Sequence, residues 1–182
     1  MYIPIFITAV FCPWGRNPEL IVHGSVAAAL LLAGIALRLW AIRYMGRSNR
    51  TQRAKARALM TQGPFALTRN PLYVSNLTGV AGFVLLSGLD WFVVPAVALA
   101  WVWYDVIVRW EEKLLEERFG LAYAGYRERV PRWVSFRRGG PAGEAEAPPQ
   151  SWLRALWLER NAWIGGIALA AAILLVRRVM QR

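Results

Sequence analysis

Residues that hold metal ions or form covalent crosslinks are scarce: the 182-residue chain has one cysteine, Cys12, and one histidine, His23. A single thiol cannot form an internal disulfide, and a single imidazole cannot build a multi-histidine metal site, so we expect no metal centre. Acidic residues are also few, with 11 Asp and Glu against 22 Lys and Arg, for a net charge of +11. The basic residues lie between apolar segments without a nucleic-acid fold signature. The expected partner is therefore a membrane bilayer and not a nucleic acid.

The rest of the chain is strongly apolar: 57% of its residues are hydrophobic and ten are tryptophan. This composition predicts an all-α fold, a polytopic transmembrane helical bundle of about 4–5 membrane helices. Apolar runs long enough to cross or nearly cross a bilayer lie at 20–42, 71–87 and 91–108. Whether 1–14 and 152–176 span fully stays open. The first is short, and the second ends in Arg177 and Arg178, which a span would place against the positive-inside rule.

The runs at 71–87 and 91–108 are separated only by Ser87-Gly88-Leu89-Asp90, which predicts an antiparallel helical hairpin. That turn has no Lys or Arg, whereas 43–70 has seven and no acidic residue, so both ends of the hairpin should lie at the cytoplasmic face. Beyond Arg109 the second arm continues as a charged helix, which Gly120 is expected to end. We expect an integral membrane protein of a bacterial inner membrane, with its active site facing the cytoplasm.

Arg38 lies near the end of the apolar run at 20–42 and is expected to snorkel toward the interface. Ser75-x-x-x-Gly79 permits close contact with a neighbouring helix.

We divide the chain into four parts. The four parts are N-terminal membrane helices with a basic loop at 1–60, a hairpin and cofactor segment at 61–136, a Pro/Gly/Ala-rich linker at 137–150, and a C-terminal hydrophobic helix at 151–182.

Asn70-Pro71 begins the hairpin and permits two interpretations. Asn is a good N-cap and Pro suits the first helical position, so the pair can simply mark a helix start. The start also lies beside Arg69 and Tyr73, at a helix N-terminus that favours anionic groups, so a ligand carboxylate could bind there.

Glu111 and Glu112 lie where the other arm leaves the membrane. They can belong to a solvated helix face, with Arg109 pairing to Glu112. Because the hairpin closes on itself, however, Asn70 and the 109–112 turn should lie at the same depth and within side-chain reach. Asp105, an ionisable residue in the apolar arm, is a functional candidate by default, although a helix-internal pair with Arg109 explains it equally simply.

Together these residues resemble the isoprenylcysteine carboxyl methyltransferase family, within the membrane methyltransferases that include the phospholipid N-methyltransferases. The resemblance covers about residues 63–134, and its blocks are specific in their order and spacing. The family usually has histidine where this chain has Asn70. The matching blocks are Gly63-Pro64-Phe65, Arg69-Asn70-Pro71-Leu72-Tyr73, Glu111-Glu112, Phe119-Gly120, Tyr123, Tyr126 and Val130-Pro131-Arg132.

The resemblance implies S-adenosylmethionine as methyl donor and a lipophilic or amphipathic acceptor that enters from the lipid. The acceptor is an isoprenylcysteine-like carboxylate or, alternatively, a lipid amine. Arg109 would orient the acceptor, and Glu112 would act with it in catalysis. Two other readings are a sterol-reductase-like oxidoreductase, for which the chain is short, and a non-catalytic membrane protein. The implied cofactor-binding residues are Arg69, Asn70, Pro71, Tyr73, Glu111, Glu112, Tyr123, Tyr126 and Arg132.

Overall fold

The computed structural model describes residues 20–45, 58–134 and 149–180, and these residues are helical with short connections. The expected apolar segment at 1–14 and almost all of the expected linker at 137–150 lie outside the described residues. The elements are α2 (Leu20–Met45), η2 (Gly63–Ala66), α3 (Pro71–Ser87), η3 (Asp90–Phe92), α4 (Val93–Phe119), α5 (Leu121–Arg129), α6 (Trp152–Leu158) and α7 (Arg160–Met180).

The hairpin predicted from the sequence is confirmed as α3 and α4. Pro71 occupies the first turn of α3, where its missing N–H costs no helical hydrogen bond. Gly88 ends α3 with φ of 81°, a left-handed conformation that favours glycine, and η3 then leads the chain into α4. Gly120, with φ of 50°, ends α4 as expected and turns the chain directly into α5.

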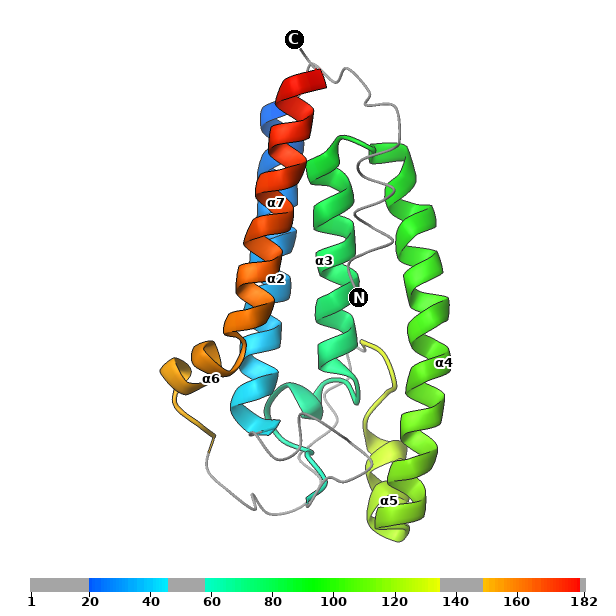
Figure 1. Cartoon of the computed structure of the whole chain (residues 1–182). Coiled ribbons are helices and arrows are strands. Elements are labelled where there is room, and N and C mark those ends of the chain that lie inside the picture. The colour runs from blue at the N-terminus through cyan, green and yellow to red at the C-terminus, as the bar shows by residue number, and fades with distance from the viewer. Residues whose placement is uncertain (1–19, 46–57, 135–148, 181–182) are drawn as a thin grey trace.

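Four long helices, α2, α3, α4 and α7, run along one another, while α5 lies beside the lower end of α4 (Figure 1). The contact between α2 and α3 is the most extensive in the bundle. Ser75 donates a hydrogen bond to the Gly34 carbonyl at 2.8 Å, and a Cβ on Gly34 would lie 3.1 Å from the Ser75 carbonyl. The close contact predicted at Ser75 is therefore present. Gly79 makes no such approach, because a Cβ built there meets nothing within 4 Å.

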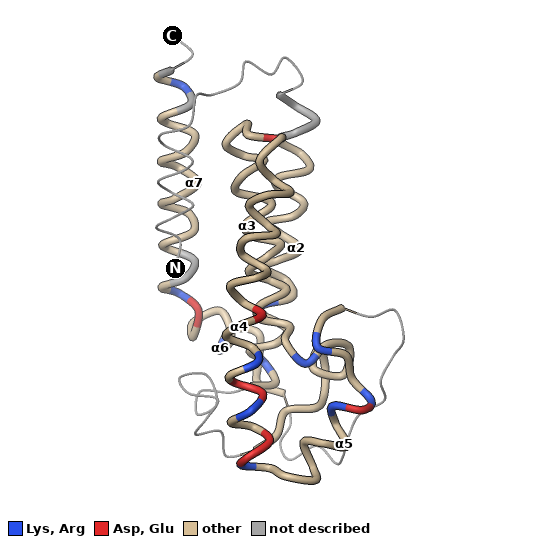
Figure 2. The backbone as a smooth tube through the Cα atoms, turned by 90° about the vertical axis from the view of Figure 1, so that its right-hand side faces the viewer, with Lys and Arg blue, Asp and Glu red and all other residues tan. Residues whose placement is uncertain are grey.

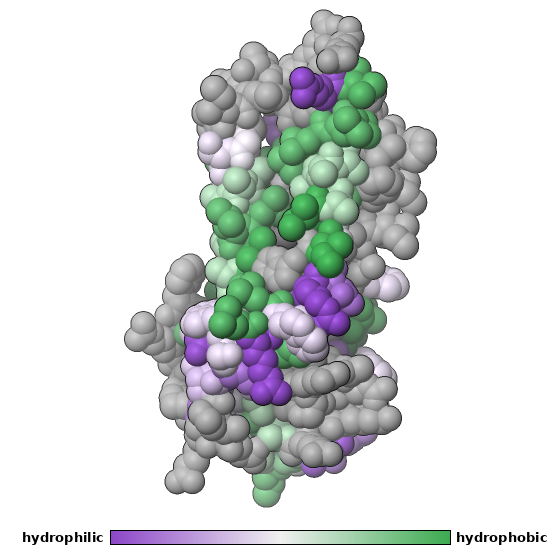
Figure 3. All heavy atoms as spheres, turned by 60° about the vertical axis from the view of Figure 1, so that its left-hand side comes forward, coloured by the Kyte–Doolittle hydropathy of each residue, from purple (hydrophilic) through white to green (hydrophobic). Residues whose placement is uncertain are grey.

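By length and composition, Gly24–Met45 and Asp90–Phe119 are able to cross a membrane, and α3 and Ile164–Val176 are shorter apolar helices. The outer face of α4 exposes large apolar side chains, among them Val94, Leu99 and Trp103. Hydrophobic residues likewise dominate the upper part of the face in Figure 3, whereas hydrophilic ones gather below. In Figure 2 the charged residues concentrate at the end that carries α5. An apolar belt beside a charged end suits a bundle set in lipid.

The C-terminal hydrophobic segment is two helices, since the chain bends at Glu159 between α6 and α7. Ser151 caps α6 by accepting a hydrogen bond from the Arg154 N–H at 3.3 Å. α6 lies across the lower part of the bundle, and α7 runs up beside α2 and α3, where Leu169 and Ile173 pack against Phe83 (Figure 1). The guanidinium of Arg38 is bound to Glu159, with its Nε 2.8 Å from Oε2.

Candidate functional site at the ends of the hairpin

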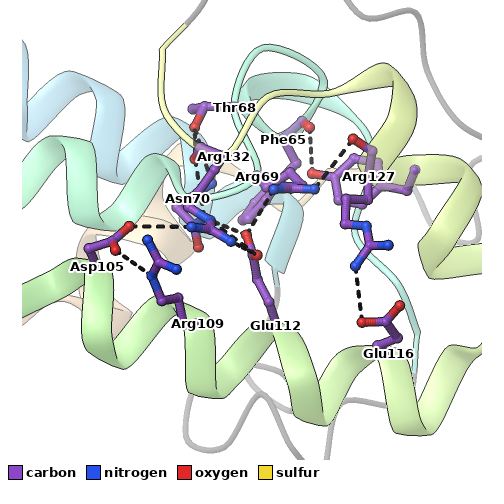
Figure 4. A network of polar contacts seen from close by, with 11 residues as sticks. Phe65, Thr68, Arg69, Asn70, Asp105, Arg109, Glu112, Glu116, Arg127 and Arg132 are labelled. Carbon is purple, nitrogen blue, oxygen red and sulfur yellow. Dashed lines mark hydrogen bonds and ion pairs between the residues drawn. The ribbon is translucent and has the colours of Figure 1, made fainter.

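The two ends of the hairpin meet at one level, as their antiparallel arrangement requires. The side-chain amide of Asn70, at the start of α3, lies 3.5 Å from Oε1 of Glu112 on α4 (Figure 4). Both side chains are buried, with Asn70 1% and Glu112 7% exposed. Glu112 is thus not part of a solvated helix face. A buried carboxylate needs cationic or hydrogen-bonding partners, and this one has several.

Asn70 is the N-cap residue of α3, but its side chain makes no capping hydrogen bond. Its amide instead donates to Glu112 and, at 3.2 Å, to the carbonyl of Arg132. The hydroxyl of Thr68 donates to the same carbonyl at 3.0 Å, and the Arg69 N–H donates to the Pro131 carbonyl at 2.9 Å. The segment before α3 therefore holds the Val-Pro-Arg segment in place through its backbone.

Two arginines neutralise Glu112. Arg132 donates to Oε2 through both Nε, at 3.1 Å, and Nη2, at 2.9 Å, so two charge-assisted hydrogen bonds share this oxygen. Nη2 of Arg69 lies 3.2 Å from Oε1. The hydrogen bonds to Glu112 raise the pKa of Arg132 above its ordinary value, and the Glu112 and Asp105 charges add to that shift. The Nε of Arg69 is buried without a hydrogen-bond partner among the described residues, so it retains a donor for a ligand.

Asp105 continues this network toward the membrane. One oxygen lies 3.4 Å from Nη1 of Arg132, and the other accepts from Nε of Arg109 (Figure 4). The pair between Asp105 and Arg109 expected from their spacing is present, whereas Glu112 pairs with Arg69 and Arg132. The side chain of Arg109 is 66% exposed and lies at the edge of the network.

Glu111 and Tyr73 meet on a neighbouring face of the hairpin. The phenol of Tyr73 donates to Oε1 of Glu111 at 3.0 Å, and its ring lies against that of Tyr104, with centroids 5.1 Å apart. Pro71 is buried at the start of the same helix. The arms are thus joined by two carboxylate contacts, one through Asn70 and one through Tyr73.

Tyr123 and Tyr126 on α5 form an aromatic wall beside the cluster. Both are buried, and the phenol of Tyr126 donates to the Phe65 carbonyl at 2.7 Å. A cavity of about 40 Å³ lies between this wall, Arg69, Asn70 and Glu112. One water needs about 10–15 Å³ of such a volume, so the cavity has room for only a few water molecules. A larger ligand must therefore widen it.

The structure brings most of the predicted site residues into one connected arrangement, with Arg109 at its edge. The sequence list of site residues omitted Asp105, although an acidic residue within an apolar helix is a signal of function. Thr68 and the carbonyl of Phe65 were also missed, because a hydroxyl and a backbone group carry no distinctive sequence pattern.

The sequence pattern of the phospholipid methyltransferase family matches residues 22–122. The chain belongs to this family of membrane methyltransferases. The match includes both ends of the hairpin and ends before Tyr123, Tyr126 and Arg132. The match supports the resemblance to the membrane methyltransferases as a group, but it does not single out the isoprenylcysteine carboxyl methyltransferases.

Two curated bacterial proteins resemble the chain. One is the cobalt-zinc-cadmium resistance protein CzcN of Cupriavidus metallidurans, 35% identical over 128 residues, which are 68% of this chain and 54% of that protein. The other is the nickel-cobalt-cadmium resistance protein NccN of Alcaligenes xylosoxydans xylosoxydans, 30% identical over 114 residues, 58% of this chain and 50% of the relative. The chain thus spans about half the length of each. No solved structure matches it. The described residues contain no group of three or more His, Cys, Asp or Glu able to hold a metal ion.

Proposed function

We propose that this chain is an S-adenosylmethionine-dependent methyltransferase that works at the cytoplasmic face of a bacterial inner membrane. The observation that carries the proposal is the buried Glu112, which lies within the segment that matches the family and is held between Arg69, Asn70 and Arg132. Buried charged clusters in a cleft at the membrane edge are frequent functional sites. The described charged residues gather at that end of the bundle (Figure 2), which supports its placement in the cytoplasm.

The residues present fit the cofactor by their chemistry. Its amino-acid end carries a carboxylate, which suits the unsatisfied Nε of Arg69. Its hydroxyl and amino groups are donors, which suit the carboxylates of Glu112 and Glu111. Its adenine suits the aromatic wall of Tyr123 and Tyr126. When bound, S-adenosylmethionine would supply an electrophilic methyl group.

The chain's own contribution is alignment and exclusion of water. Methyl transfer requires the two reacting atoms in line and close together, more than it requires a strong acid or base. Asn70, at the start of α3, lines the cavity together with Glu112 and the tyrosines of α5. Arg132 is tied to Glu112 beside this cavity. The cavity of about 40 Å³ must widen, and the partly exposed Arg132 is the side chain that we expect to move.

We further propose that the acceptor is an amphipathic molecule whose anionic group is recognised by Arg109. Its Nε is bound to Asp105, while its terminal nitrogens have no hydrogen-bond partner among the described residues. With 66% of the side chain exposed, the group is accessible from the lipid edge. A prenylated cysteine presents a carboxylate to such a cation, and that carboxylate is then methylated. A phospholipid presents a phosphate, with methylation on its amine, and the description of the family favours this second candidate.

Cofactor binding is the first test. We expect S-adenosylhomocysteine to bind saturably to the purified protein in detergent, and Glu112→Gln to weaken binding at least tenfold. Glu116→Gln is the matched control, because Glu116 lies one turn further along α4 and pairs with Arg127 at 3.1 Å in an exposed position. The control should change the affinity less than twofold. Absence of saturable binding to the wild type would overturn the proposed function, and equal effects of both variants would overturn the site.

Radiolabelled methyl transfer then separates the two acceptors. The assay compares a prenylated cysteine analogue with vesicles of phosphatidylethanolamine. Arg109→Gln should raise KM for the true acceptor at least fivefold while the affinity for S-adenosylhomocysteine stays within twofold. An unchanged KM would exclude Arg109 from acceptor recognition. Transfer to neither acceptor, despite cofactor binding, would refute both acceptor assignments.

A further inference from the structure

A second and larger cavity, of about 250 Å³, lies between α2, α3 and α7. Most of its wall is apolar, with Leu31, Phe83 and Ile167 contributing from the three helices. Gly79 and Gly166 also line it, and a Cβ built on either meets no atom within 4 Å. The space is therefore open beside both glycines. An apolar space of this size forfeits dispersion contacts unless something fills it.

This cavity is separate from the candidate site. It shares no lining residue with the smaller cavity. Gly79 is nine residues after Asn70 on α3, a rotation of about 180° at 3.6 residues per turn, so the two face opposite sides of the helix. The wall supplied by α7 also lies beyond residues 22–122, which match the family.

The polar end of this cavity is an ion pair between distant segments. Nε of Arg38 donates to Oε2 of Glu159 at 2.8 Å, and Nη1 donates to the side-chain oxygen of Asn76 at 3.1 Å. Glu159 is fully buried, whereas the Arg38 side chain is 24% exposed. When charged residues within an apolar bundle line a cavity, that cavity is a candidate binding site by default.

The level of this ion pair suits a lipid headgroup. Arg38 is seven residues before Met45, the cytoplasmic end of α2 in the proposed orientation, which is about 10 Å along the helix. Amphipathic groups bury to about 5–10 Å at the boundary between headgroups and acyl chains. One cation and one carboxylate together suit a phosphate and an ammonium on the same headgroup, and a purely anionic headgroup would be repelled by Glu159.

We propose that the cavity binds one acyl chain of a zwitterionic phospholipid from the surrounding bilayer, with its headgroup at Arg38 and Glu159. The cavity, of about 250 Å³, is bounded by three helices, so it takes part of one chain between them. The lipid fills the gap between α7 and the family's helices. It is a bound lipid on the far side of α3 from the candidate site, and the proposal does not depend on methyl transfer.

Native mass spectrometry of the full chain, extracted into mild detergent and washed, tests this site. We expect the wild type to retain one phosphatidylethanolamine per chain. Gly166→Leu places a side chain in the open space and should reduce retention at least fivefold. Gly165→Leu is the matched control, because Gly165 is exposed on the same helix, does not line the cavity and also has no atom within 4 Å of an added Cβ. Retention in this control should match the wild type.

Gly79→Leu provides an independent filling variant from α3, should either α7 variant fail to fold. Arg38→Gln tests the headgroup, and should abolish a preference for phosphatidylethanolamine over phosphatidylglycerol that the wild type shows when both are supplied in equal amounts. Unchanged retention in folded Gly79→Leu or Gly166→Leu would overturn the cavity as the binding site. Equal retention of the two lipids by the wild type would overturn the headgroup assignment.

Discussion

Replacement of Glu112 by glutamine tests whether the charged cluster holds the ends of the hairpin together. The carboxylate accepts from Arg132 at 3.1 and 2.9 Å and faces Arg69 at 3.2 Å, while Glu112 is 7% exposed. Glutamine keeps the shape but leaves Arg69 without its anion and Arg132 with Asp105 alone, at 3.4 Å. Removing one partner of a buried ion pair costs about 3–5 kcal/mol. Because the Arg132 side chain is 29% exposed and partly solvated, we expect about 3 kcal/mol.

The assay is the midpoint of thermal unfolding in detergent, with Glu116→Gln as control. The side chain of Glu116 is 46% exposed and pairs with Arg127, and exposed pairs contribute about 0–1 kcal/mol. At about 2–4 °C per kcal/mol, Glu112→Gln lowers Tm by about 6–12 °C and the control by less than about 4 °C. Equal shifts in the two variants would refute the reasoning, because a buried cluster and an exposed pair would then be energetically alike.

Three further predictions concern other parts of the fold. Tyr126→Phe leaves the Phe65 carbonyl without its 2.7 Å partner and should lower the free energy of unfolding by about 1–3 kcal/mol, measured by denaturant titration. Gly120→Ala forces a side chain into φ of 50° and should destabilise by about 1–3 kcal/mol in the same titration. Gly125→Ala, inside α5 with ordinary contacts, should instead stabilise by about 0.5–1 kcal/mol, and a reversed order would contradict the backbone argument. Asp105→Asn weakens the anchor of two arginines and should raise KM for the acceptor at least threefold with S-adenosylhomocysteine affinity within twofold; an unchanged KM would exclude an orienting role.

The hairpin could be predicted because its signals are local. Pro71 at a helix start, a four-residue turn with Gly88 and a stop at Gly120 each fix the backbone without reference to the rest of the chain. The level of Asn70 relative to Glu112 follows from the tight turn, which returns the second arm antiparallel to the first. That geometry is enough to bring the two ends of the site together, and the structure has both side chains buried and in contact.

Interactions between distant segments could not be predicted in this way. Asn70 could be interpreted as a helix cap. An asparagine that caps a helix and one that donates a hydrogen bond to a distant carboxylate have the same local sequence. The bend at Glu159 was missed, since a carboxylate in an apolar run becomes compatible with burial only when Arg38, 121 residues away, supplies its partner. The sequence suggested only that Arg38 lies near the interface and gave no sign of this partner.

Asn70 determines how the site responds to pH. An amide donates hydrogen bonds without titrating, whereas a histidine, the usual residue of the resembled family, titrates near neutral pH. The hydrogen bonds to Glu112 raise the pKa of Arg132, which lies beside Asn70, above its ordinary value, so this arginine keeps its charge. We therefore expect the affinity of the wild type for S-adenosylhomocysteine to vary less than twofold between about pH 6 and 8. In Asn70→His, protonation as the pH falls adds a cation that competes for Glu112, so the affinity should fall at least threefold over the same range. Titration calorimetry measures the affinity of both proteins as a function of pH. A change in the wild-type affinity with a midpoint within this range would mean that another group in the site titrates.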